Sequence, residues 1–161
     1  MMPSSLIKLN YLEVHLASQI GMMRQEISLQ KGLKDSHGFD GENGWSIHIE
    51  GAGGEMAVAK YANTYWMGSV NTFKKINDVG KVEVRTRSRD YYDLLIRNDD
   101  KNEDVFVLVV GKIPDFKIVG WLKGKDAKKP EWLKTYANRE AAYFVPQSEL
   151  NSPESLIEMI K

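Results

Sequence analysis

The chain has 161 residues, in which 22 lysines and arginines balance 22 aspartates and glutamates, and it has no cysteine. This length suits one compact domain over residues 1–161, and the missing cysteines exclude disulfide scaffolds, thiolate zinc sites and cysteine nucleophiles. No apolar run approaches the roughly 20 residues that span a bilayer, so we expect a cytoplasmic protein with no membrane partner.

The first third of the chain predicts helices separated by a loop. Residues 6–14 are ambiguous, because strand alternation and helical spacing each fit them in part. From residue 16 onward, apolar residues follow a 4, 3, 4 spacing that is typical of one helical face. These residues are Leu16, Ile20, Met23 and Ile27. We expect this helix to stop near Gly32 and a polar loop to cover residues 34–44.

A glycine-rich segment follows, which we interpret as a turn between a strand and a helix. Residues 45–50 predict a short strand, and glycines at 51, 53 and 54 would allow the backbone to turn. The helix after them is expected from about Gly54 to Trp66. Glu55 shares one face of it with small and apolar residues, so an acidic side chain opens an otherwise apolar stripe.

The rest of the chain predicts strands in close succession. Residues 81–87 alternate between valine or threonine and charged residues, and residues 91–97 predict a second strand. Residues 105–110 are apolar at every position, which is typical of a central strand covered on both faces. Residues 116–122 predict another strand, residues 123–134 a basic loop, and a short helix is expected from near Ser152. We therefore expect an α/β domain with a mixed sheet of four or five strands flanked by helices.

Two carboxylates in the middle of the chain are the strongest chemical signal. Asp78 precedes a Val-Gly turn and Glu83 lies five residues later on the next strand, so the two can converge at one edge of the sheet. Two carboxylates and a backbone carbonyl, such as that of Val84, suit Mg²⁺ or Mn²⁺. Such an ion activates water and neutralises charge on a phosphodiester. Arg85 points to the same side as Glu83 and could hold the phosphate.

Glu55 and the charged strand each have a simpler explanation. A carboxylate on an apolar face requires a cation, a metal or a favourable place in the first turn of its helix, and the sequence leaves these three open. A strand with alternating charges is most often only a solvated face.

Together these residues resemble the PD-(D/E)XK nuclease superfamily, whose core is restriction-endonuclease-like. The similarity lies in Glu55 within Gly-Gly-Glu-Met-Ala, then Asp78, then Glu83-Val84-Arg85, and it is closest to small phage and prophage members over residues 47–122. The resemblance implies that Asp78 and Glu83 are metal ligands and that Glu55 is an outer ligand, directly or through water. It also implies a metal-dependent endonuclease acting on DNA.

One departure from this family concerns the reaction itself. Arg85 replaces the lysine of the family's triplet, and arginine cannot give up its proton near neutral pH, so it cannot act as a general base. It can still orient water or stabilise a charged transition state. Asn77 replaces the motif's proline, which is a common variation.

The distribution of charge permits a nucleic-acid partner despite the neutral total. Residues 71–90 hold six basic and three acidic residues, and residues 112–134 hold seven and three, whereas the first sixty hold five basic and seven acidic. With so small a surplus we expect DNA binding to be weak and salt-sensitive. The candidate contacts are Lys81, Arg87, Lys125, Lys128 and Trp132.

The sequence leaves two other classes of function open. The first is a catalytically weakened module that keeps the fold and binds DNA or a protein partner. The second is a structural protein in which Arg85 merely neutralises Glu83 or Asp78. The sequence identifies no self-complementary surface, so a homodimer is left open.

Overall fold

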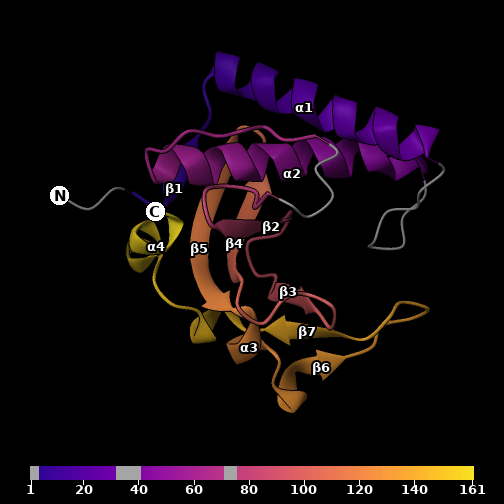
Figure 1. The fold of residues 1–161 in the computed structure, drawn as a ribbon, viewed down its shortest axis with the longest axis vertical. Helices are drawn as coiled ribbons and strands as arrows, with labels where there is room; N and C mark the ends of the chain where they lie inside the picture. Colours follow the sequence, from indigo (N-terminus) through magenta and orange to yellow (C-terminus); the bar gives the residue numbers. More distant parts are fainter. Residues whose placement is uncertain (1–3, 32–40, 71–75) are drawn as a thin grey trace.

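Helices, a mixed sheet and a smaller sheet form successive layers in the computed structural model, which describes residues 4–31, 41–70 and 76–161 (Figure 1). The helices are α1 (Tyr11–Gln30), α2 (Gly41–Tyr61), α3 (Gly124–Ala127) and α4 (Pro153–Ile160). The first sheet has the order β1 (Leu6–Lys8), β5 (Asp115–Lys123), β4 (Val105–Lys112) and β2 (Val82–Arg87). The second has the order β3 (Leu94–Arg97), β7 (Ala142–Val145) and β6 (Leu133–Lys134). No helix in these ranges is long and apolar enough to span a membrane.

The first sheet is mixed, as the sequence predicts. β1 and β4 both pair antiparallel with β5, whereas β2 pairs parallel with β4 and forms the edge of the sheet in the described part of the chain. The prediction that all the strands belong to one sheet is wrong, because β3 pairs with β7 instead. Alternation identifies a strand but carries no information about which strand it will pair with.

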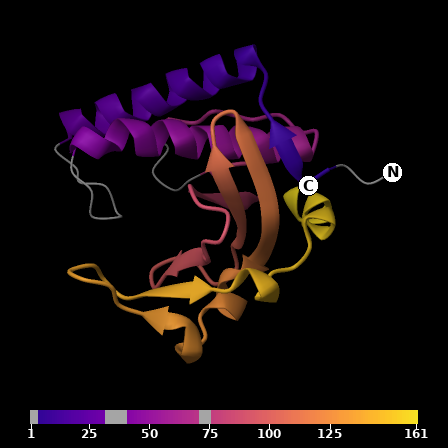
Figure 2. The same ribbon diagram turned by 180° about the vertical axis from the view of Figure 1, so that it is seen from behind.

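β4 is the centre of the domain. Val105, Val107 and Val109 lie in a core beneath α2 and α4, while alternate residues of the same strand lie in a second core toward β3 and β7. The strand is therefore covered on both faces, which confirms the prediction made from its continuous apolar run. The rear view shows α4, the last helix of the chain, beside β5 (Figure 2).

α1 begins at Tyr11 and buries a different face from the one that its apolar spacing predicts. Asn10 and Glu13 form a reciprocal capping box that fixes this start. The buried residues are Ala17, Gly21 and Gln25, whereas Leu16 and Met23 are each 46% exposed. A Cβ on Gly21 would lie 2.5 Å from the Cα of Ile49 on α2. The small residues thus face α2 because only they allow the two backbones to approach so closely.

α2 spans Gly41–Tyr61, so the predicted strand over residues 45–50 and the turn after it are wrong. The glycines serve helix packing rather than a turn. A Cβ on Gly54 would meet the Oγ1 of Thr86 at 1.9 Å, and one on Gly53 would meet the side chain of Ile113 at 2.8 Å. They let α2 lie directly on the first sheet, and this carries Glu55 toward β2.

The remaining predicted elements agree with the structure apart from their ends. β2, β4 and β5 fall on their predicted segments, the second predicted strand is shortened to β3, and the C-terminal helix starts at Pro153 after Ser152. The basic loop contains α3, the 3-10 turn Pro130–Trp132 and β6. The expected stop at Gly32 and the loop over residues 34–44 fall largely outside the described residues.

Candidate acidic site at the edge of the first sheet

A tight turn folds Asp78 back beside β2. The backbone N–H of Val79 donates to the carbonyl of Val82 at 3.1 Å, and the N–H of Val82 donates to the carbonyl of Val79 at 2.9 Å. Gly80 in this turn has φ +54°, and a Cβ there would lie 2.6 Å from the carbonyl oxygen of Ile160. Glycine is therefore required for two independent reasons, namely its left-handed backbone and the close approach of α4.

The turn brings the carboxyl groups of Asp78 and Glu83 together. Asp78 Oδ2 accepts the backbone N–H of Val84 at 2.8 Å, Glu83 Oε1 accepts Nδ2 of Asn77 at 2.8 Å, and the two carboxyl groups lie within hydrogen-bonding reach of each other. The N–H and C=O of one strand residue leave the strand on the same side. The carbonyl of Val84 therefore lies on the same outer edge as Asp78, where a metal ion held by the acidic pair would need it.

Burial and repulsion combine to hold a proton at this pair. Burial first, and then the neighbouring carboxylate of Glu83, raise the pKa of Asp78 to about 7, against the opposite effects of the N–H of Val84 and the charge of Arg24. Two carboxylates held together out of water disfavour each other's charge. A bound cation would therefore relieve the repulsion between the two carboxylates.

Glu55 is engaged by a residue that the sequence analysis missed. Arg24 of α1 forms two hydrogen bonds with it, from Nη1 to Oε2 at 2.7 Å and from Nη2 to Oε1 at 3.0 Å, and Trp66 Nε1 donates to Oε1 at 3.2 Å. Arg24 Nε also donates to the carbonyl of Ser69 at 3.0 Å. Among the three roles left open for Glu55, the geometry thus gives it a cation partner.

The charge of Glu55 still acts on the acidic pair. Burial first, and then the charge of Asp78, raise the pKa of Glu55 to about 6, against the opposite effects of Arg24 and Trp66. Arg24 also lowers the pKa of Asp78. Arg24, Glu55 and Asp78 therefore form one electrostatic system. Arg24 lies on the small-residue face of α1, and a charged residue on that face is the signal that could have identified it.

Arg85 is paired with a residue from a distant turn rather than with either carboxylate of the pair. Its Nη2 donates to Oδ1 of Asp100 at 2.8 Å, and its guanidinium lies 4.9 Å from the centre of the Phe106 ring. Oδ2 of Asp100 accepts the backbone N–H of Arg97 at 2.7 Å, which fixes the carboxylate. Asp100 lies in a polar turn whose sequence gave no reason to single out this residue.

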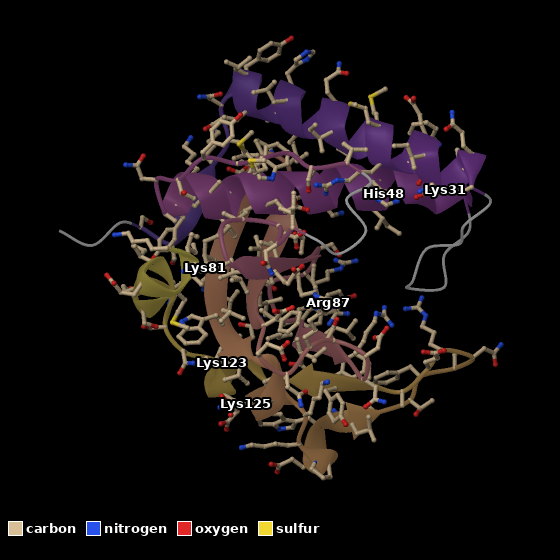
Figure 3. All side chains as sticks on the ribbon, in the orientation of Figure 1. Lys31, His48, Lys81, Arg87, Lys123 and Lys125 are labelled. Atoms are coloured by element: carbon tan, nitrogen blue, oxygen red, sulfur yellow. The ribbon has the colours of Figure 1, made fainter. Side chains whose placement is uncertain are left out.

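The candidate nucleic-acid residues do not form one cluster. Lys81 and Lys125 are exposed, and Figure 3 shows them apart from Arg87, which lies near the other end of β2. Arg87 lies 4.3 Å from the ring centre of Tyr92 and donates to the carbonyl of Asp93 at 2.9 Å. Arg87 is thus fixed in position, whereas Lys81 and Lys125 extend into solvent.

Two further candidates have structural contacts of their own. Lys128 Nζ donates to the backbone carbonyls of Asn98 and Asp100, so it fastens the turn that carries the partner of Arg85. Trp132 packs against the second core, and Nζ of Lys129 lies 4.8 Å from the centre of its ring. A DNA-contacting role for Lys128 and Trp132 stays a prediction.

The donor set at the edge of β2 consists of two carboxylates and one carbonyl. No group of three or more acidic or histidine side chains suited to a metal occurs among the described residues. An open hollow of about 660 Å³ lies between β1, the β4–β5 turn and residues 88–90, and the acidic pair does not line it.

Comparison with family models, with curated proteins and with solved structures gave no match for this chain.

Proposed function

We propose that this chain is a magnesium- or manganese-dependent nuclease that hydrolyses phosphodiester bonds in DNA and has a restriction-endonuclease-like core. The observation that carries the proposal is the contact between the carboxyl groups of Asp78 and Glu83 at the edge of β2. A stable fold gains nothing from two half-buried carboxylates in contact, because each raises the cost of ionising the other. A binding site for a hard cation would explain why the two carboxyl groups lie together.

The donor set fits Mg²⁺ or Mn²⁺. Mg²⁺ keeps several waters and is bound in proteins by one or two carboxylates together with substrate phosphates. Asp78 and Glu83 would hold the ion, and the carbonyl of Val84 lies on the same edge as a third oxygen. The bound ion would supply an activated water and neutralise charge on the phosphate.

The remaining residues have roles that follow from their contacts. Arg85 has guanidinium N–H groups beyond the one donated to Asp100, and these can hold a phosphate oxygen. Both oxygens of Glu55 accept hydrogen bonds, so we assign it the task of positioning Arg24. Arg24 balances part of the negative charge of the acidic pair.

DNA is the proposed substrate because of the charges around this site. Lys81 extends into solvent at the start of β2 and Arg87 lies at its end, on either side of the acidic pair along the strand (Figure 3). Backbone contacts of this kind fix the position of a duplex without reading its sequence. With a neutral chain overall, binding should weaken steeply as salt is added.

A plasmid-cleavage assay tests the proposal. Wild type, Asp78→Asn and Glu83→Gln are incubated with supercoiled plasmid and Mg²⁺ or Mn²⁺, and the exposed Glu158→Gln on α4 is the matched control. We expect cleavage by the wild type and the control that EDTA abolishes, and at least about a hundredfold loss in each site variant. Equal rates in all four proteins, or an intact plasmid in every reaction, would refute the nuclease assignment.

One observation favours a second candidate, a nuclease-like module that binds DNA or a protein partner without cleaving it. Arg85 stands where the related family has a lysine, and Asp100 holds its guanidinium. A wild type that shifts labelled DNA in a gel but leaves it intact with both metals would support this second function.

A further inference from the structure

The apolar stripe that the sequence predicts on α1 faces away from the domain. Leu16 and Met23 are each 46% exposed, and Ile20 and Ile27 are half-buried beside them. Leu12, one turn before the predicted stripe, is 63% exposed. In both ribbon views α1 is the outermost layer, and its far side is turned away from the rest of the described chain (Figures 1 and 2). The 4, 3, 4 spacing of this stripe is that of the seam between two helices in a coiled coil.

The chain after α2 widens this apolar surface. A Cβ on Gly68 would lie 3.3 Å from the side chain of Ile20. The segment around Gly68 therefore runs alongside α1. Tyr65 and Met67 of the segment are 81% and 60% exposed. Exposed apolar side chains of this size on two adjacent segments mark an interaction surface rather than scattered surface residues.

We propose that this face of α1 pairs with the same face of a second copy of the chain, with the two helices antiparallel. The two-fold axis then passes between Gly21 and Met22, so that Leu16 meets Ile27 of the second copy and Ile20 meets its Met23. Antiparallel helices also have favourably opposed dipoles. Such an isologous contact closes on itself and gives a dimer.

The charges beside the stripe match this orientation. His15 and Glu26 are exposed on the same flank of the stripe, and in an antiparallel pair the equivalent flanks of the two helices meet. His15 of each copy then lies within about one helical turn of Glu26 of the other. The stripe itself contains no charged residue, so the two copies bring no like charges into contact.

The expected interface is small. A helix of 20 residues is about 30 Å long and 10–12 Å wide, so α1 supplies about half of the 800 Å² per partner of a standard interface. Tyr65 and Met67 extend it toward the lower end of the specific range. We therefore expect a dimer with a dissociation constant in the micromolar range, around 1–100 μM.

Sedimentation of the full chain over a range of concentrations tests the proposal. The wild type should change from monomer to dimer, and Leu16→Glu/Met23→Glu should stay monomeric. The control is Met22→Glu/Leu29→Glu, which places the same two residue types on the same helix about a third of a turn away. These control positions are 39% and 47% exposed, so the control should fold and dimerise like the wild type.

Charge exchange and disulfide trapping test the orientation. His15→Glu should weaken the dimer, and His15→Glu/Glu26→Lys should restore it. Because the chain has no cysteine, each introduced one is the sole thiol. Leu16→Cys mixed with Ile27→Cys should form a mixed disulfide, whereas Leu12→Cys alone should not, since its copies lie about 28 Å apart.

Three results would overturn the proposal. The first is a wild type that stays monomeric at every concentration, which would assign the face to a different partner. The second is a dimer that Leu16→Glu/Met23→Glu leaves intact. The third is efficient disulfide formation by Leu12→Cys, which would indicate parallel helices.

Discussion

Replacing Asp78 with asparagine should stabilise the metal-free protein in a way that depends on pH. Asparagine keeps an oxygen to accept the N–H of Val84 and an amide to donate to Glu83, but it carries no charge. The pKa of Asp78 rises from 3.8 to about 7 on folding. The folded state therefore binds more protons than the unfolded state, and the stability of the wild type must fall as the pH rises through this window.

The magnitude follows from the pKa values. At pH 5 most of the unfolded chains have already lost the Asp78 proton, and by pH 8 the folded chains have lost it too. Between these two pH values the wild type should lose about 2–3 kcal/mol of unfolding free energy through Asp78. Asp78→Asn removes this loss, so its advantage over the wild type should grow by about that amount. Loss of the Asp78 charge also lowers the pKa of Glu55, which increases the advantage.

Urea unfolding at pH 5 and pH 8 in EDTA measures this difference, with tryptophan fluorescence as the signal. The exposed Asp126→Asn on α3 is the control, and its effect should be within about 0.5 kcal/mol at both pH values. Added Mg²⁺ should raise the stability of the wild type at pH 8 and leave Asp78→Asn nearly unchanged. A variant whose stability relative to the wild type is the same at pH 5 and pH 8 would refute the reasoning.

Three further predictions concern the surroundings of the site. Arg24→Met leaves Glu55 as a buried carboxylate without its partner, so urea unfolding should show a loss of about 3–5 kcal/mol, and much less in Arg24→Met/Glu55→Met. In Gly54→Ala the new Cβ clashes with Thr86 of β2, so the free energy of unfolding should fall by about 1–3 kcal/mol. In Gly51→Ala the new Cβ meets no atom within 4 Å, so the free energy of unfolding should rise by about 0.5–1 kcal/mol. Calorimetry can measure both changes. Arg85→Lys places a group there that can lose its proton, so Mg²⁺-dependent plasmid cleavage should rise about tenfold or more at alkaline pH. An unchanged cleavage rate would count against this account of Arg85.

Local patterns in the sequence predicted local structure well. The alternation in β2 correctly identified that strand, because successive side chains of a strand point to opposite faces of the sheet. The uniformly apolar β4 was identified because a central strand is buried on both faces. Asp78 and Glu83 could be paired from sequence because only a short turn separates them. Their convergence depends on no distant segment.

The errors come from contacts between distant segments. Arg24 lies 31 residues from Glu55, and Asp100 lies 15 residues from Arg85, and no local pattern links the members of either pair. The glycines of α2 suggested a turn because the sequence does not reveal that a sheet packs against them. The face of α1 was misjudged for the same reason, since helix contact selected small residues over large apolar ones.

The free edge of β2 also bears on solubility. An uncovered strand edge offers its N–H and C=O groups as a template for pairing with another chain. The backbone N–H and C=O of Val82 are hydrogen-bonded to Val79, and the N–H of Val84 donates to Asp78. Another chain therefore cannot pair as a strand with this end of β2. The turn that brings Asp78 beside Glu83 thus also protects the edge of β2 from aggregation through strand pairing. Replacing Asp78 with alanine would expose the N–H of Val84 as well as remove a carboxylate, whereas asparagine separates the two effects.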